Sequence, residues 1–238
     1  MLTLFFSEHI STGQTQVLED DEAHHAIKVL RLNYGEIIKI SDGVRNWVSG
    51  PIVEIAKKKL SITITDRGEI QKAKPELVLV QAVTKSDRNK EMLELVVEAG
   101  VDRIIPWKSD RSISKWQSDS TQKWQAAIKQ SCKQARQIKL PELMPAMSTS
   151  EIVHWISHEG IGIIFHEEAS IKFSEISIPS SQTSIFVIIG PEGGISEQEL
   201  ILFENNGSKI VRLGDTVLRS AHAGFAALSA LQTKLGRW

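Results

Sequence analysis

Cysteine is almost absent from this sequence of 238 residues, which contains only Cys132. A single cysteine excludes an internal disulfide and argues against a metal site that is built on cysteine ligands. Long apolar runs are missing as well, since a stretch such as residues 185–189 is far shorter than the roughly 20 residues that a membrane helix needs. The first residues show no basic segment and no small-residue cleavage site, so we expect no signal peptide. These absences favour a cytoplasmic globular protein that has no part in a membrane.

The net charge of −1 hides an uneven distribution of charge along the chain. Residues 108–139 contain eight basic residues and only two acidic ones, so this segment has a charge of +6 and the remainder −7. Local positive charge on a slightly acidic protein is typical of enzymes that act on nucleic acids. A solvated helix face would show the same charges, and both interpretations fit the charge pattern equally well.

The first 70 residues have the pattern of a small β-barrel. Residues 35–43 and 57–69 alternate β-branched and polar side chains between charged or glycine turns, and Asp42-Gly43 is a hairpin-type turn. One short helix is predicted over residues 20–32, with acids in its first turn and basic residues near its end, as the helix dipole prefers. The polar stretch 71–75 ends in proline and is interpreted as a linker, so the first domain would comprise residues 1–72.

After this linker the pattern changes to alternating strands and helices, over a second domain of residues 73–238. Four apolar runs, at residues 76–83, 101–107, 160–168 and 184–190, are predicted as strands. Their nearly continuous hydrophobicity is expected when helices cover both faces of a mostly parallel sheet. Helices are predicted over residues 88–100, 121–137, 196–207 and 218–236, and Gly224 in the last one suits close packing against another helix. The predicted fold class is therefore α/β.

A glycine-rich loop lies inside "FVIIGPEGGISEQEL", residues 186–200, between a predicted strand and a predicted helix. Such loops usually hold a phosphate, but Ser196 and Glu199 form a capping box that already satisfies the helix amides that a phosphate would use. The Walker and dinucleotide patterns are absent, and Glu192 would repel a phosphate. The loop instead offers backbone groups suited to a purine and a ribose, beside a carboxylate that tolerates a cation. A tight structural turn would use the same glycines.

A second segment repeats this layout. Residues 209–224, "KIVRLGDTVLRSAHAG", read as a short strand, a loop around Leu213-Gly214, and a helix. Two consecutive units of this kind would place two backbone-lined loops side by side at the carboxyl edge of a sheet. Ligands bind at that edge in open α/β folds.

Together, "IIGPEGGISEQEL" and "VRLGDTVLRSAHAGFAAL" resemble the paired signature of the RsmE family, the 16S ribosomal RNA uridine-N3 methyltransferases of the SPOUT superfamily. The resemblance covers the whole chain. Residues 24–43 resemble the family's N-terminal PUA-like RNA-binding barrel, residues 84–112 its first α/β unit, and residues 129–147 its central basic helix and the turn after it. The resemblance therefore implies that a C-terminal α/β trefoil-knot domain follows the barrel.

The resemblance also implies a cofactor, S-adenosylmethionine, bent inside the knot and held mainly by backbone groups of three loops. Those loops would start after Phe165, Ile189 and Leu213. The residues assigned to the cofactor are Phe165, His166, Glu167, Ile189, Gly190, Pro191, Gly193, Gly194, Leu213, Gly214 and Leu218. An acidic loop agrees with this assignment, because the donor is a sulfonium cation. The partners implied are 16S ribosomal RNA or the small ribosomal subunit, and a second copy of the chain in a homodimer.

Methylation of N3 of uridine requires that the base leave its stack, that N3 lose its proton, and that the resulting negative charge be balanced near the donor. Arg219 is the candidate for balancing that charge or orienting the uracil, although a salt-bridged arginine at a helix start would look the same. Glu192 is the second catalytic candidate, as a proton acceptor or as a residue that shapes the loop or contacts the donor. The sequence departs from the family at Ser220-Ala221-His222, where the acidic position is altered while a hydroxyl is kept.

Six residues are candidates for RNA contacts through charge or hydrogen bonding. They are Lys28, Arg31, Lys85, Arg111, Gln134 and Arg136. Arg111 would position phosphate or base, and Gln134 would read a uracil edge, although solvated positions explain both equally well. His154 and His158 have helical spacing but no third ligand and no metalloprotease glutamate, so no metal is predicted. Two alternatives remain, a SPOUT methyltransferase with another RNA target and a non-catalytic RNA-binding factor in ribosome assembly.

Overall fold

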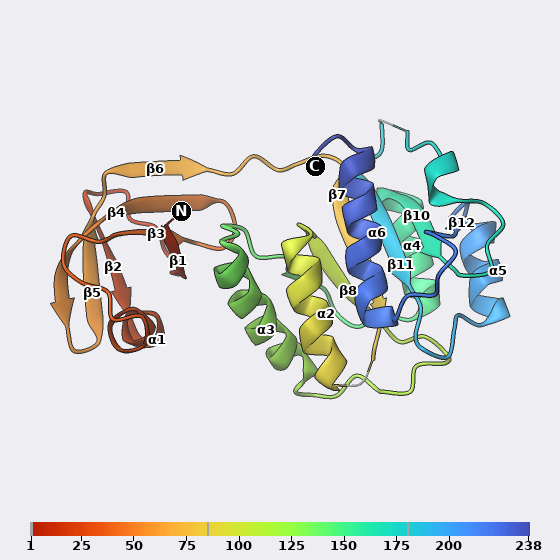
Figure 1. Ribbon diagram of the computed structural model, residues 1–238, viewed down its shortest axis with the longest axis horizontal. Coiled ribbons are helices and arrows are strands. Elements are labelled where there is room, and N and C mark those ends of the chain that lie inside the picture. The colour runs from red at the N-terminus through yellow and green to blue at the C-terminus, as the bar shows by residue number, and fades with distance from the viewer. Residues whose placement is uncertain (1, 85, 180) are drawn as a thin grey trace. The chain divides into compact units, whose positions relative to one another are not determined.

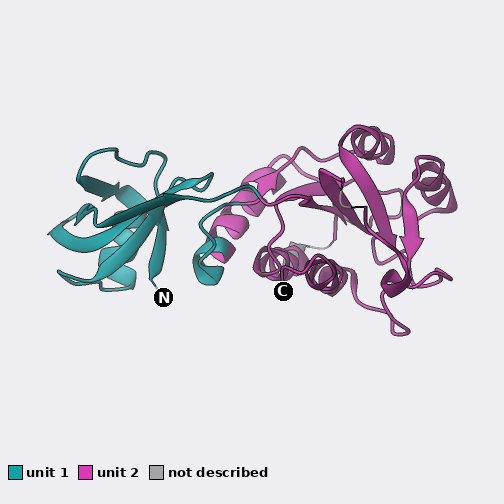
Figure 2. Cartoon of the chain, turned by 90° about the horizontal axis from the view of Figure 1, so that it is seen from above, with its two compact units in different colours: residues 1–72, 132–140 teal, residues 73–131, 141–238 magenta. Residues whose placement is uncertain are grey.

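The computed structural model describes residues 2–84, 86–179 and 181–238, which form two compact units (Figures 1 and 2). The first unit comprises the residues up to Lys72 together with Cys132–Leu140, and the second comprises Ala73–Ser131 and Pro141–Trp238. The segment 132–140, which was predicted within the second domain, therefore belongs to the first unit. It is held in the first unit by an ion pair of 2.7 Å between Lys133 Nζ and Glu22 Oε1. The amide of Leu140 also donates to the carbonyl of Gly43 over 2.7 Å.

The first unit is a six-stranded sheet with one helical segment. Its strands are β1 (Thr3–Phe6), β2 (Thr15–Glu19), β3 (Ile37–Ser41), β4 (Asn46–Ala56), β5 (Lys59–Thr63) and β6 (Asp66–Glu69). The order is β1-β3-β4-β5-β2, with β6 paired to β4, and only β1 and β3 run parallel. The predicted helix is present as α1 (Asp20–His24), which continues as a π-helical segment, η1 (His25–Val29).

This sheet curls around one core. Phe5 from the edge strand β1 and Leu18 from the opposite edge strand β2 share a buried cluster with Ile40, Val48 and Leu60 from the central strands. Residues of both edges can meet in one cluster only if the sheet bends strongly, as in a barrel. The predicted barrel-like first part of the chain is therefore confirmed.

The turn between β3 and β4 begins at the predicted Asp42-Gly43 pair. Oδ1 of Asp42 accepts hydrogen bonds from the amides of Val44, Arg45 and Asn46 over 2.7–3.0 Å. Burial alone would raise the pKa of Asp42, but the hydrogen bonds donated to its carboxylate outweigh burial and hold the pKa below its usual value. Gly43 follows in the left-handed region at φ +74°, which explains the glycine at this position.

The second unit contains a parallel sheet, as the sequence predicts. Its strands are β7 (Glu76–Ala82), β8 (Arg103–Trp107), β9 (Glu142–Leu143), β10 (Gly160–Phe165), β11 (Ser184–Ile189) and β12 (Lys209–Val211). They pair in parallel in the order β12-β10-β11-β7-β8-β9. Every residue of β7, β8 and β11 is buried, which accounts for their nearly continuous hydrophobicity. The predicted α/β fold class is confirmed.

Helices cover both faces of this sheet (Figure 1). They are α2 (Ser86–Glu98), α3 (Ser120–Ala135), α4 (Thr149–Glu159), α5 (Glu197–Asn205) and α6 (Ser220–Lys234), with a short 3₁₀ turn, η2 (Phe173–Glu175). Ile152 of α4 and Phe203 of α5 share a core cluster with alternate residues of the strands, such as Val78 and Val80.

On the opposite face α6 packs against α2 and the sheet. A Cβ atom at Gly224 would lie 3.3 Å from Val96 of α2 and 3.4 Å from Leu79 of β7, so the predicted close helix packing at this glycine is confirmed. Within the described residues, no helix is long and apolar enough to cross a membrane.

Candidate functional site

The carboxyl ends of β10, β11 and β12 meet at one edge of the sheet, and the loops that follow them enclose two adjoining cavities. The larger, of about 260 Å³, is called the donor cavity below. The smaller has a volume of about 70 Å³. Because the strands are parallel, side chains and backbone groups far apart in the sequence converge here.

Most of the predicted cofactor residues line these cavities. The donor cavity is lined by Phe165, His166, Glu167, Ile189, Gly190, Pro191, Gly194 and Leu218, and the smaller cavity by Leu213 and Gly214. Gly193 lines neither cavity, and its carbonyl accepts a hydrogen bond of 3.4 Å from Arg111 Nη1. The two predicted catalytic residues, Glu192 and Arg219, also line the donor cavity.

The GPEGG loop owes its shape to its glycines and to the helix cap that follows. The amide of Gly194, at φ +74°, donates to the carbonyl of Pro191 over 2.9 Å and closes a tight turn. Ser196 then caps α5, and Ser196 and Glu199 form the predicted capping box. The helix amides are thus already occupied, which agrees with a loop that does not bind phosphate.

Glu192 is paired with an arginine that the sequence interpretation missed. Its Oε1 lies 3.4 Å from Nη1 of Arg88, in the first turn of α2, and both residues line the donor cavity. A positive charge in the first turn of a helix interacts unfavourably with the helix dipole. The position of Arg88 in the sequence could therefore have indicated a role other than helix stabilisation. The pairing makes Glu192 part of a partly exposed ion pair at the cavity wall.

Arg219 occupies the N-cap position of α6, and its side chain is exposed. Among the residues that the structure describes, none forms an ion pair with its guanidinium, unlike the salt-bridged alternative. The backbone carbonyl of Arg219 accepts hydrogen bonds from the amides of His222 and Ala223. The backbone is thereby anchored while the guanidinium stays available at the cavity.

Ser220, next to Arg219, links α6 to the GPEGG loop. Its hydroxyl donates to the carbonyl of Gly190 over 2.7 Å and accepts a hydrogen bond of 3.0 Å from Nε2 of the fully buried Gln81. In the same segment, where the sequence differs from the family pattern, Ala221 is buried and Nε2 of His222 lies 3.1 Å from Glu91 Oε1 of α2. The retained hydroxyl therefore has a structural task, and the altered residues pack into the protein or pair with α2.

A buried carboxylate, Glu199, fixes the loop that carries Arg111. Oε1 of Glu199 accepts hydrogen bonds from the amide of Asp110 over 3.0 Å and from Thr149 Oγ1 over 2.9 Å. Oε2 accepts from the amide and the hydroxyl of Ser196, each at 3.0 Å. The sequence predicted only the capping role, because the other two donors come from segments distant in sequence.

The predicted RNA contacts are divided between the two units. Lys28, Arg31, Gln134 and Arg136 are exposed residues of the first unit, whereas Arg111 belongs to the second. Lys85 lies outside the described residues. Arg31 and Arg136 both adopt positive φ, at +54° and +55°, directly after helical segments.

The two histidines of α4 contact one another, and the single cysteine is buried. The rings of His154 and His158 are tilted by 52° with centroids 4.4 Å apart, and Nδ1 of His158 lies 2.8 Å from the carbonyl of His154. Within the described residues, no group of three or more His, Cys, Asp or Glu side chains is arranged to hold a metal. Burial raises the pKa of the Cys132 thiol to about 12, which leaves it protonated and unreactive near neutral pH.

Comparison with known proteins places the chain in a class. Residues 71–232 match the RNA methyltransferase domain family, and residues 18–65 match the PUA domain of RNA methyltransferases. The chain is thus an RNA methyltransferase with an N-terminal PUA domain.

The particular family follows from the individual relatives. The ribosomal RNA small subunit methyltransferase E of Mycobacterium bovis is 30% identical, over 99% of this chain and 93% of that protein. A crystal structure of the enzyme of that name from Neisseria gonorrhoeae, bound to S-adenosyl methionine, is 27% identical with a TM-score of 0.88 and covers 98% of both chains. A methyltransferase structure from Legionella pneumophila, with S-adenosylmethionine bound, is 26% identical with a TM-score of 0.86 and covers 98% of both chains. The chain belongs to the ribosomal RNA small subunit methyltransferase E family, which confirms the resemblance to RsmE.

Proposed function

We propose that this protein transfers a methyl group from S-adenosylmethionine to N3 of a uridine in 16S ribosomal RNA. The observation that carries the proposal is the donor cavity, where loops after three parallel strands bring backbone groups, Glu192 and Arg219 to one place. Membership of the family and the donor bound in two related structures support the choice of cofactor.

The donor would lie in the two adjoining cavities, against the loops after β10, β11 and β12. Backbone groups of the glycine-rich loop suit the adenine and ribose, and apolar side chains such as Ile189 and Leu218 suit the ring faces. Glu167 and Glu192 offer carboxylates to the sulfonium cation, and Arg88 and Arg219 add positive charge to the same lining.

Arg219 would act on the uracil rather than on the donor. Removal of the N3 proton leaves charge on N3, O2 and O4, and a guanidinium at the cavity rim balances this charge without disturbing the donor. The carboxylate of Glu192 contacts the guanidinium of Arg88 at the cavity wall. We assign Glu192 to the shape and charge of the cavity.

The remaining roles follow the two parts of the chain. Residues 1–72 would bind RNA through exposed basic side chains such as Lys28 and Arg31, and residues 73–238 would carry out methyl transfer. Contacts of basic side chains with the RNA backbone position an RNA without specifying its sequence. The substrate would be 16S ribosomal RNA or the small subunit, which places the protein in the cytoplasm.

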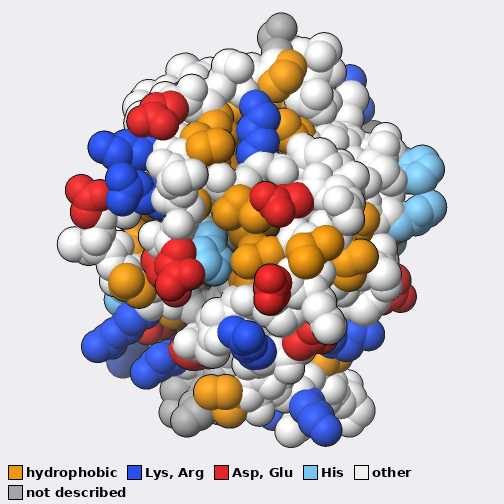
Figure 3. Space-filling model, turned by 90° about the vertical axis from the view of Figure 1, so that its right-hand side faces the viewer, with side chains coloured by type: hydrophobic (Ala, Val, Ile, Leu, Met, Phe, Trp, Pro, Cys, Tyr) orange, Lys and Arg blue, Asp and Glu red, His pale blue; other side chains and the backbone are white. Residues whose placement is uncertain are grey.

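The surface supports the proposal of a homodimer through the second unit. Hydrophobic side chains gather in the middle of the face shown in Figure 3, with acidic side chains among them. The exposed large apolar residues of this unit include Ile201, Leu202, Val217 and Leu218, and Val217 is 76% exposed. Exposed apolar groups close to a ligand cavity are typical of a surface that another chain covers.

Two measurements test the proposed function. Calorimetry is expected to show binding of S-adenosylmethionine, and ribosomal RNA from a strain that lacks the gene is expected to lose one N3-methyluridine from 16S RNA. Loss of a different methylated base would instead favour a methyltransferase with another RNA target. Failure to bind the donor at millimolar concentration would favour the non-catalytic assembly factor.

Replacing Gly190 with alanine is expected to weaken S-adenosylmethionine binding by about 10-fold. A Cβ atom there would lie 2.6 Å from Cγ1 of Ile195, so the loop or Ile195 must move at the wall of the donor cavity. Calorimetry measures the change. Gly13→Ala is the matched control, because its Cβ would meet nothing closer than Ser11 Oγ at 3.5 Å. Unchanged donor affinity in Gly190→Ala would contradict the placement of the donor.

A further inference from the structure

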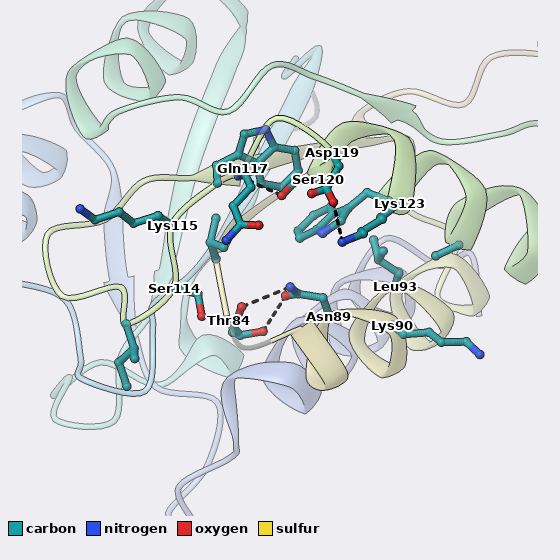
Figure 4. A pocket seen from close by; sticks show the side chains of 15 residues that line it. Thr84, Asn89, Lys90, Leu93, Ser114, Lys115, Gln117, Asp119, Ser120 and Lys123 are labelled. Atoms are coloured by element: carbon teal, nitrogen blue, oxygen red, sulfur yellow. Dashed lines mark hydrogen bonds and ion pairs between the residues drawn. The ribbon is translucent and has the colours of Figure 1, made fainter.

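Another cavity, of about 640 Å³, lies within the second unit between α2, the loop before α3, and the first turns of α3 (Figure 4). It is distinct from the donor cavity but close to it. Arg88 of α2 lines the donor cavity, whereas the next two residues, Asn89 and Lys90, line this one. The two cavities therefore flank the same turn of α2. The roles proposed above for the donor cavity make no use of this one.

Two tryptophans form an aromatic wall of this cavity. The rings of Trp116 and Trp124 meet edge to face, with centroids 4.9 Å apart and an angle of 73° between their planes. Trp124 is only 4% exposed and so is fixed in the protein, while Trp116 is half-buried and lies in the loop before α3. The buried ring holds the outer one in place, which provides a rigid surface against which a planar group can stack.

Three basic side chains and one acidic side chain, Asp119, lie around this aromatic wall. Lys90, Lys115 and Lys123 line the cavity from α2, the loop and α3, and Figure 4 shows the side chains of Lys90 and Lys115 directed outward at its rim. Nζ of Lys90 lies 3.8 Å from Oε1 of Glu94, and Nζ of Lys123 lies 2.7 Å from Oδ2 of Asp119. Both lysine side chains are 71% exposed. Lys115 is exposed, and within the described residues no acid forms an ion pair with it.

The floor of the cavity is rigid as well. Oγ1 of Thr84 donates to Oδ1 of Asn89 over 2.7 Å, and Nδ2 of Asn89 donates to the carbonyl of Thr84 over 3.2 Å. This reciprocal pair joins the end of β7 to the start of α2 and uses the side-chain groups of both residues. The polar groups left for a ligand are then at the rim, chiefly the lysines and the exposed amide of Gln117.

We propose that this cavity, the Trp116 pocket, binds one unstacked nucleotide of the RNA substrate close to the methylated uridine. Its base would stack on Trp116 and its phosphate would lie near Lys115. Aromatic rings beside a positively charged groove are the usual means of holding single-stranded nucleic acid. The proposal rests on the proposed function, because a base that reacts at N3 must leave its stack, and a held neighbour keeps the strand open.

Replacing Trp116 with alanine is expected to raise the KM for RNA about 5- to 100-fold, the range for loss of one stacked base. Because the pocket touches neither the donor nor the reacting atoms, kcat at saturating RNA and the affinity for S-adenosylmethionine should stay unchanged. Trp116→Phe keeps an aromatic face and should recover most of the KM. In RNA that carries 5-iodouridine near the target, irradiation of the wild-type protein should form a cross-link to Trp116, located by mass spectrometry.

Lys115→Ala provides a test that leaves the tryptophan packing intact. Loss of one phosphate contact should lower the slope of log Kd against log salt concentration by about 0.7, with an unchanged thermal midpoint. Trp238→Ala and Lys172→Ala alter exposed residues that do not line the pocket and should leave KM and the slope as in the wild type.

The outcomes separate this proposal from the proposed function. A wild-type protein that methylates RNA, with normal KM in both Trp116→Ala and Lys115→Ala, would overturn the pocket alone. A wild-type protein that neither binds S-adenosylmethionine nor methylates RNA would overturn both. Higher KM in both variants, with kcat and donor affinity retained, would establish the pocket.

Discussion

Arg219→Ala is expected to lower kcat for methyl transfer by about 100- to 1,000-fold, the usual cost of removing one group that stabilises developing charge. The affinity for S-adenosylmethionine should change little. Arg219 lines the donor cavity from the N-cap of α6, where its guanidinium is exposed and is not engaged in an ion pair with any described residue. Steady-state assays at saturating 16S RNA give kcat, and calorimetry gives the donor affinity.

Two further variants make this result specific. Arg219→Lys keeps a charge but loses the planar fork of donors, so it should recover only part of the rate. Arg45→Ala removes another exposed arginine, paired with Glu69 in the first unit, and should leave kcat unchanged. A loss of donor affinity in Arg219→Ala, with a normal rate at saturating donor, would move Arg219 from the uracil to the cofactor.

The sequence predicts the local part of this site well and the distant part poorly. The capping box at Ser196, the glycine turn and the packing at Gly224 depend on residues close in sequence or on a periodic pattern, and all three are present. Convergence of the strand ends follows from the parallel α/β pattern alone. The Arg88–Glu192 pair joins residues 104 positions apart, and no periodic signal links them.

The candidate RNA-binding residues are divided between the two units for the same reason, because long-range contacts decide where they lie. Gln134 and Arg136 lie on the helix that was predicted within the second domain, but residues 132–140 pack with the first unit. The long-range contacts that decide this, such as Ser41 Oγ donating to the carbonyl of Ile138 over 2.7 Å, leave no trace in the hydrophobic pattern. Helix boundaries can be predicted from the hydrophobic pattern of the sequence. The part of the protein against which each turn of the helix packs cannot be predicted in this way.

Glu199→Ala is expected to destabilise the protein by about 3 kcal/mol, because several donors to a buried charged acceptor would be left unsatisfied at once. Glu199 is 2% exposed and accepts from Asp110, Thr149 and Ser196. Denaturant unfolding measures the loss. Methyl transfer should also fall in the variant that remains folded, because the loop with Arg111 loses its anchor beside Gly193.

Glu197→Ala is the matched control, since Glu197 lies in the same first turn of α5 but is exposed. It should cost only about 0.3–1 kcal/mol through the helix dipole, with normal activity. Glu199→Gln keeps the volume but points an amide group at donors, so its stability should fall between those of the two alanine variants. Equal stability of Glu197→Ala and Glu199→Ala would show that Glu199 is only a helix cap, and the loop before α3 would then need another anchor.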